Sequence, residues 1–154
     1  MLEIQTLPVT ELVPHAGSMS LLQQVIAADE NSLTARVSPA NHGLFNHHGQ
    51  IGAWLGIEYM AQAIAAWAGW QQRQKSAQPK IGLLLGTRRY TTSQATFSPH
   101  DQLTVTIQRI FQAENGLGQF DCQILADDVC IASAALTVFE PDDPESFLKL
   151  NTNA

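Results

Sequence analysis

The stretch "HGLFNHHGQIGAWLGIEYMAQAIAAWAG", residues 42–69, decides the fold of this 154-residue chain. From Ala53 to about Gln72 the residues are strong helix formers, and apolar side chains occupy nearly every face of the helix that they predict. A helix that is apolar all round is buried in protein, yet this one contains an acid, Glu58. We therefore predict a buried central helix that carries one carboxylate.

Strand-like segments lie on both sides of this helix in the sequence. Two precede it, at residues 20–30 and 32–39. Four follow it, at residues 81–97, 101–114, 118–127 and 129–140. Apolar residues alternate clearly in the second of these four, where Leu103, Val105 and Ile107 share one face, which Arg109 extends. The letters "ADDV", residues 126–129, predict a hairpin turn between the last two strands.

A single helix that is apolar on all sides needs a sheet that wraps around it. The order of elements therefore predicts an α+β fold, in which one curved antiparallel sheet surrounds one long central helix. We expect one domain over residues 1–141, followed by an acidic, polar tail at residues 142–154. Such a half-open sheet leaves an edge strand, which natural proteins often cover by pairing it with a second subunit.

Composition excludes several classes of function. The net charge of -6 argues against general nucleic-acid binding. The run at residues 51–69 is as long as a membrane span, but Glu58 and Gln62 interrupt it, so burial in protein is favoured. No signal peptide is visible, and Cys122 and Cys130 are interpreted as reduced core thiols of a cytoplasmic protein. No CxxC or HxxxH spacing supports a metal site.

Several large or small side chains of the helix allow two interpretations. Trp54, Trp67 and Trp70 either fill the core or line a tunnel for a substrate chain, and the core is favoured. Small residues allow close approach of backbone or of an acyl chain, although tight packing against the sheet is the favoured explanation for most of them. These small residues are Gly56, Ala61, Ala65 and Ala68.

Basic residues gather in one short span of the chain. Five of the eight lie within residues 73–89: Arg73, Lys75, Lys80, Arg88 and Arg89. They form either a solvated helix end and loop or a small cationic dock for an acidic or phosphate-bearing partner.

Four segments resemble the hotdog-fold family of β-hydroxyacyl–(acyl carrier protein) dehydratases. They are "LVPHAGSMSLLQQV" at 12–25, "GLFNHHGQIGAWLGIEYMAQ" at 43–62, "ATFSPHDQLTV" at 95–105, and the last two strands. Together they span almost the whole chain. Within the family, the chain is most similar to the branch of predicted 3-hydroxyacyl–(acyl carrier protein) dehydratases found in aryl polyene biosynthesis clusters.

The resemblance implies a chemistry and a set of residues. The family removes water from a 3-hydroxyacyl thioester held on the phosphopantetheine of an acyl carrier protein, with no cofactor of the enzyme's own. A loop histidine and a helix carboxylate move the two protons. Glu58 matches that carboxylate, and Gln62 matches the glutamine one turn further on. The N–H of Ala53 matches the donor to the thioester oxygen, and Arg88 with Arg89 are the expected contact for the carrier protein.

The position of the family's histidine is occupied by Leu44, which precedes Phe45 in the segment expected to line the substrate. Leucine cannot transfer a proton. In one account His42, His47 or His48 supplies the imidazole, although all three also fit solvated loop histidines.

A second account uses the symmetry of hotdog dimers, in which the histidine and the carboxylate of one site come from different subunits. A homodimer would then place Leu44 in both sites, whereas a heterodimer with a related subunit would restore one complete site. A third account is a non-catalytic subunit that binds acyl chains or stabilises a partner. A thioesterase on the same fold is a further alternative, with Glu58 activating water.

Overall fold

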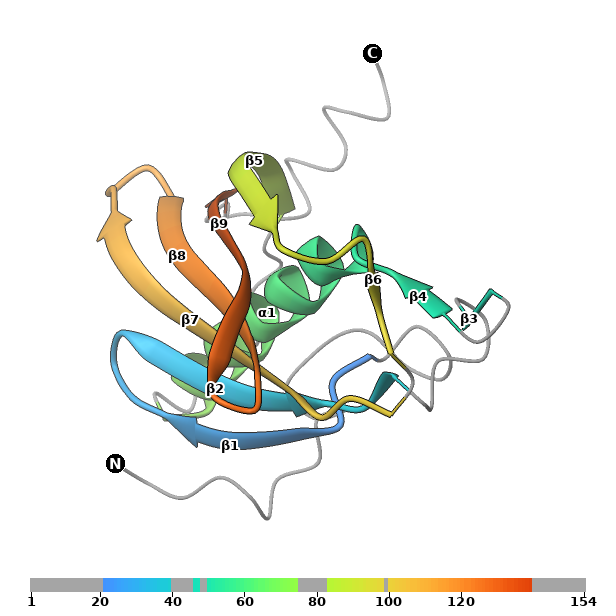
Figure 1. The fold of residues 1–154 in the computed structure, drawn as a ribbon. Coiled ribbons are helices and arrows are strands. Elements are labelled where there is room, and N and C mark those ends of the chain that lie inside the picture. The colour runs from blue at the N-terminus through green and yellow to red at the C-terminus, as the bar shows by residue number, and fades with distance from the viewer. Residues whose placement is uncertain (1–20, 40–45, 48–49, 75–82, 99, 140–154) are drawn as a thin grey trace, which may run out of the picture.

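The structure describes residues 21–39, 46–47, 50–74, 83–98 and 100–139. In this computed structural model, an antiparallel sheet of six strands curves around the long helix α1 (Leu55–Gln74) (Figure 1). Its spatial order is β1 (Gln24–Ala28), β2 (Ser32–Val37), β7 (Leu103–Gln112), β8 (Leu117–Ala126), β9 (Val129–Phe139) and β5 (Leu83–Thr92). A smaller sheet joins β3 (Asn46–His47), β4 (Gln50–Gly52) and β6 (Thr96–Phe97). The predicted α+β architecture is confirmed.

The helix packs against every strand of the larger sheet, as a buried central helix must. It starts two residues later than predicted, because Ala53 and Trp54 form a turn before it. The prediction that it is buried on all sides is only partly right. Positions at helical spacing form one half-exposed stripe in this single chain: Ile57, Glu58, Ala61, Ala65 and Ala68.

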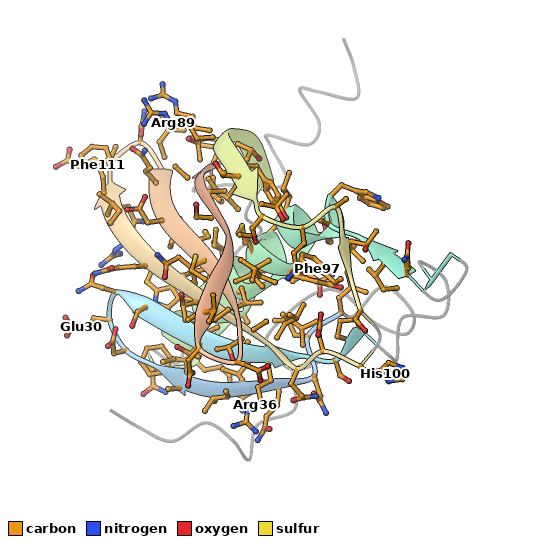
Figure 2. All side chains as sticks on the ribbon, in the orientation of Figure 1. Glu30, Arg36, Arg89, Phe97, His100 and Phe111 are labelled. Atoms are coloured by element: carbon orange, nitrogen blue, oxygen red, sulfur yellow. The ribbon has the colours of Figure 1, made fainter. Side chains whose placement is uncertain are left out.

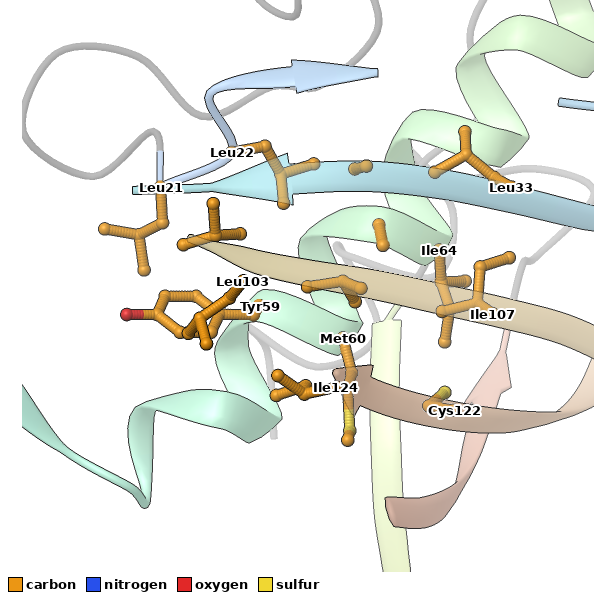
Figure 3. Packing of buried hydrophobic residues seen from close by; sticks show 14 of the residues in the cluster. Leu21, Leu22, Leu33, Tyr59, Met60, Ile64, Leu103, Ile107, Cys122 and Ile124 are labelled. Carbon is orange, nitrogen blue, oxygen red and sulfur yellow. The ribbon is translucent and has the colours of Figure 1, made fainter. Parts of the chain in front are cut away.

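The core lies between α1 and the inward face of the sheet. Leu103, Val105 and Ile107 are buried as their alternation predicts, and Figure 3 shows Leu103 beside Tyr59 and Ile107 beside Ile64 of the helix. The fourth member of that face, Arg109, lies with its guanidinium 5.1 Å from the centre of the Trp67 ring. Burial of this apolar face is the main stabilising term of such a fold.

The segment at residues 81–97, predicted as one strand, divides into β5 and β6, which belong to different sheets. The break falls at residues 93–95, between the end of β5 and the start of β6. The Thr92 hydroxyl donates to the carbonyl of Gln94 at 2.7 Å and accepts from its N–H at 3.2 Å. This local turn redirects the chain, because a side-chain hydroxyl that bonds the backbone two residues further on competes with the strand ladder.

Two expectations about the core are corrected. Trp67 and Trp70 are buried, whereas Trp54 is 65% exposed because it precedes the helix and projects from the turn. Cys122 is a buried thiol, and burial raises its pKa to about 12. Cys130 is exposed. The register of β8 with β9 shifts near Leu125, which pairs with Cys130, so this cysteine falls on the outward face.

The predicted hairpin turn is confirmed. Asp127 and Asp128 have φ values of 50° and 65°, the left-handed pair that a tight hairpin turn of this kind requires. The predicted tail at residues 142–154 lies outside the described residues. Among the described elements, no helix is long and apolar enough to cross a membrane.

Candidate active site

Glu58 and Gln62 lie one turn apart on α1 and are joined by a hydrogen bond. The Gln62 side chain is fully buried, and its Nε2 donates to Glu58 Oε1 at 3.1 Å. Its Oε1 accepts from the N–H of Leu21 at 2.9 Å. The Leu21 amide needs an oxygen opposite it, so the Gln62 amide group is forced to present its NH₂ to Glu58. One buried side chain thus orients the carboxylate.

The surroundings of Glu58 suit a group that exchanges protons with another molecule. Its side chain is only half-buried, in contrast to that of Gln62. It also lies in the first turn of the helix. The fold therefore offers an acid that is held in one place and still accessible from outside the chain.

The turn before the helix is pinned by both backbone groups of Ala53. Its N–H donates to the carbonyl of Ala95 at 2.9 Å. Its carbonyl accepts from the Tyr90 hydroxyl and from the Gly56 N–H, the latter at 3.0 Å. The expectation that the Ala53 N–H donates to the thioester oxygen is therefore corrected, because this N–H is already bonded within the chain.

The histidine-bearing loop is only partly described. His42, Leu44, Phe45 and His48 lie outside the described residues. The backbone of His47 belongs to β3 and pairs with Gln50 of β4, the strand that runs into the helix turn. The structure thus places the backbone of Asn46 and His47 beside β4, and the role of each histidine stays a prediction.

Arg88 and Arg89 are both exposed on β5, at the edge of the larger sheet. Their exposure side by side breaks the alternation of a regular strand. A register shift between Arg88 and Thr91 explains it, and Arg89 has a φ of 55°. Two adjacent cations are therefore presented on the surface, as a dock requires.

Sequence reasoning missed the contact between Gly56 and Tyr90. A Cβ on Gly56 would lie 2.2 Å from the Tyr90 hydroxyl oxygen, so only glycine fits there without displacing the ring. Gly56 was expected to allow a close approach, but its partner could not be identified from sequence. Burial raises the pKa of Tyr90 and of Tyr59 above the usual value of 10.0, so both hydroxyls stay protonated donors at neutral pH.

The arrangement can position and deprotonate, or protonate, a substrate group at Glu58. Within the ranges that the structure describes, no three His, Cys, Asp or Glu side chains gather in a way that could hold a metal ion. The chemistry that the described residues can offer is proton transfer by one oriented carboxyl group.

Comparison with known proteins extends this picture. Residues 7–149 match the family described as ApeP-like, ApeP dehydratase. The chain is similar to the dehydratase heterocomplex ApeI:P from Xenorhabdus doucetiae, at 29% identity and a TM-score of 0.86, over 94% of this chain and 98% of that one. A search of curated proteins found no match.

More distant structures share the fold alone. A hypothetical thioesterase with coenzyme A from Streptococcus pneumoniae is 13% identical, with a TM-score of 0.59 over 76% of this chain and 84% of that one. Cj0977, a virulence protein from Campylobacter jejuni, is 14% identical, with a TM-score of 0.62 over 88% of each chain. The fold is the hotdog fold that the sequence predicts. With almost its whole length matched, the chain belongs to the ApeP-like dehydratase family.

Proposed function

We propose that this chain is the carboxylate-bearing subunit of a heterodimeric 3-hydroxyacyl–(acyl carrier protein) dehydratase of polyene biosynthesis. The single observation that carries the proposal is the chain of bonds from Leu21 through Gln62 to Glu58, which orients an accessible acid. Residue 44 is leucine, at the position where the β-hydroxyacyl–(acyl carrier protein) dehydratases that the sequence resembles have their histidine. In this proposal the imidazole therefore comes from the related partner subunit. The likeness to a dehydratase heterocomplex supports this division of labour.

The two halves of the site share the elimination. The partner's imidazole removes the proton α to the thioester, and the electron pair of that C–H bond forms the new double bond. The bond between the β-carbon and its hydroxyl breaks as Glu58, in its protonated form, delivers a proton to the leaving oxygen. Water departs, and the carboxylate is reprotonated when the imidazole releases its proton. A carboxyl that is oriented but reachable suits this step.

The carrier protein is the second proposed partner. Acyl carrier proteins present an acidic surface and a phosphate-bearing arm, and Arg88 with Arg89 offer two exposed guanidinium groups for such a partner. Arg88 lies just before the register shift in β5, and the shift allows Arg89 to be exposed beside it, where regular alternation would turn Arg89 inward. The substrate thus arrives on the carrier, and this chain needs no cofactor of its own.

The test of the acid is co-purification of this chain with a hotdog subunit encoded beside it, followed by dehydration of a carrier-bound 3-hydroxyacyl thioester. Glu58→Gln keeps the shape of the side chain and its bond to Gln62, but cannot supply the proton. We expect the rate to fall by about 10²–10⁴-fold. The matched control is Glu114→Gln, an exposed acid in the β7–β8 turn, which is expected to leave the rate unchanged.

Other results would identify the alternatives. Full activity of the Glu58→Gln complex would make this chain a non-catalytic subunit. Hydrolysis of acyl thioesters without dehydration would select the thioesterase. A stable, active homodimer would return the histidine role to His42, His47 or His48 of this chain.

The test of the dock is the paired variant Arg88→Gln and Arg89→Gln. We expect KM to rise for a carrier-bound substrate and to stay constant for the same acyl group on free pantetheine, because only the carrier reaches the surface cations. Arg36→Gln is the control, since Arg36 is exposed on β2 and lies far from Arg89 (Figure 2). An equal change for both substrates would contradict the dock.

A further inference from the structure

We infer that Tyr90 is a positioning residue of this site, whose hydroxyl, delivered by a bulge in β5, fixes the start of α1 and with it the place of Glu58. The hydrogen bond between Tyr90 and Ala53 is independent of the proposed function. The effect of this bond on catalysis rests on the proposed function. Three observations carry the inference: the bulge, the bond to Ala53 and the absence of a side chain at Gly56.

The bulge changes which side chain points toward the helix. Arg88 pairs with Ala135 and Thr91 pairs with Ser133, so Arg89 and Tyr90 together oppose one residue of β9. Strict alternation after the outward Arg88 would turn Arg89 inward. The extra residue lets Arg89 stay exposed, at a φ of 55°, and turns Tyr90 toward the helix. A non-glycine residue in this left-handed region is uncommon and is retained where the surrounding structure demands it.

The inward Tyr90 meets the helix at its first turn. Its hydroxyl donates to the carbonyl of Ala53, which also accepts from the Gly56 N–H. A Cβ at Gly56 would lie 2.2 Å from the hydroxyl oxygen and 3.2 Å from the ring carbon that bears it. The absence of a side chain at Gly56 therefore leaves room for the Tyr90 hydroxyl to reach the Ala53 carbonyl.

The segment from Tyr90 to Ala95 holds Ala53 from both sides. Tyr90 binds its carbonyl, and Ala95 accepts from its N–H. Glu58 lies in the first turn of α1, five residues after Ala53, so a movement of the turn that contains Ala53 shifts the helix start and the carboxylate with it. Misplacement of a reacting group by about 1 Å costs on the order of 100-fold in rate. A bond that fixes the turn therefore acts on the chemistry without touching the substrate.

The experiment compares Tyr90→Phe with the wild type, both in complex with the partner subunit. Phenylalanine keeps the ring and loses only the hydroxyl. We expect kcat to fall about 10-fold, KM to stay within about twofold, and amide hydrogen exchange to speed up at Gly56 and Ile57. Thr87→Val is the matched control, because it removes an exposed hydroxyl from the same strand and is expected to change neither readout.

Gly56→Ala provides a second route to the same loss. Its methyl group would displace the Tyr90 hydroxyl, so its effect on kcat is expected to resemble that of Tyr90→Phe. The double variant is expected to lie within about twofold of the slower single variant, because both changes break one contact. The Ile124 Cδ1 atom, 2.9 Å from the added methyl, can move aside as the end of a flexible side chain.

The outcomes separate the inference from the proposed function. Unchanged exchange at the helix start in Tyr90→Phe overturns the inference, whatever the activity. Unchanged kcat in Tyr90→Phe, in a complex whose wild type is active, overturns it as well. If the wild-type complex dehydrates nothing, the proposed function fails, and the exchange measurement still decides whether Tyr90 holds the helix start.

Discussion

The polar side chains in the two halves of α1 bind different kinds of partner. In the C-terminal half, Trp67 Nε1 donates to the carbonyl of Asp29 at 3.0 Å, and Gln71 Nε2 donates to the carbonyls of Asp29 and Glu30 at 3.3 and 3.1 Å. In the N-terminal half, Gln62 binds a backbone N–H on one side and the carboxylate of Glu58 on the other. The side chains of the C-terminal half therefore bind backbone carbonyls, whereas Gln62 of the N-terminal half binds a carboxylate.

The difference separates hydrogen bonds that stabilise the fold from hydrogen bonds that orient the proposed acid. Donors that end on the carbonyls of the β1–β2 turn are neutral and satisfied, so they only fasten the hairpin to the helix. Gln62 accepts a hydrogen bond from a backbone N–H and donates one to Glu58, so it orients a carboxyl group that can gain and lose a proton. We therefore expect changes in the C-terminal half to alter stability alone, and changes in the N-terminal half to alter activity.

The largest effect on stability is expected from Trp67→Ala. This ring is buried, lies edge-on to Phe120 at 5.4 Å between centroids, and carries the Arg109 guanidinium above it. Its removal is expected to lower the free energy of unfolding by about 3–5 kcal/mol, measured by urea denaturation of the complex at fixed concentration. The control is Phe111→Ala, an exposed aromatic, with an expected loss below about 1 kcal/mol. Equal losses would contradict the assignment of Trp67 to the core.

Gln62→Leu is the next largest change and tests the other half. It removes the hydrogen bond that the Leu21 N–H donates to Gln62 and the one that Gln62 donates to Glu58, so the free energy of unfolding is expected to fall by about 1–3 kcal/mol. Unlike Trp67→Ala, it is also expected to lower kcat per folded complex.

The matched control for that variant is Gln72→Leu. Gln72 is a buried glutamine of the same helix but belongs to the C-terminal half. We expect its replacement to leave kcat unchanged. A similar fall in kcat for both variants would show that any buried glutamine of α1 affects the site. That result would contradict the difference between the two halves of the helix.

Gln71→Leu is expected to have a smaller effect. It removes the two bonds to the β1–β2 turn from a half-exposed side chain, so about 1 kcal/mol of stability is lost. Thermal unfolding measures the loss, and a steady-state assay of the same sample measures kcat. A change in kcat at full folding would contradict a purely structural role for this end of the helix.

The smallest effect is a pH dependence at the same turn. Hydrogen bonds from the N–H groups of Asn31 and Ser32 lower the pKa of Asp29 below its usual 3.8. The unfolded chain binds the proton more tightly, so this contribution is complete above that value and is lost as the pH falls below it. Asp29→Asn is expected to flatten the acid side of the stability curve while keeping the turn. An unchanged slope of stability against pH would contradict it.

Much of the fold follows from local pattern. The alternation of Leu103, Val105 and Ile107 is sufficient to predict which face of β7 is buried. Trp54 and Cys130 were assigned to the core incorrectly, because exposure depends on where a turn or a register shift places a residue. Neither feature has a signal in periodicity.

The candidate site was predicted in part. Glu58 and Gln62 were named because the "GIEYMAQ" motif resembles the helix segment of the dehydratase family. The structure joins them by a hydrogen bond, and their roles in catalysis stay a prediction. The Leu21 amide and the Tyr90 hydroxyl were not found, because each lies more than thirty residues from its partner in sequence. The Ala53 N–H was assigned to the substrate, but its bond to Ala95 depends on how β5 leads into β6.

The sequence alone determined the helix and the buried face of the sheet, because these follow from periodicity, and it supplied Glu58 as the proposed acid through a motif within one helix. Tertiary structure decided how the acid is aimed and what holds the helix start. Gln62 is oriented by the Leu21 backbone, and Ala53 is held by Tyr90 and Ala95. The physical reason is that a hydrogen bond between distant segments depends on register, and one extra residue in β5 changes which side chain faces inward.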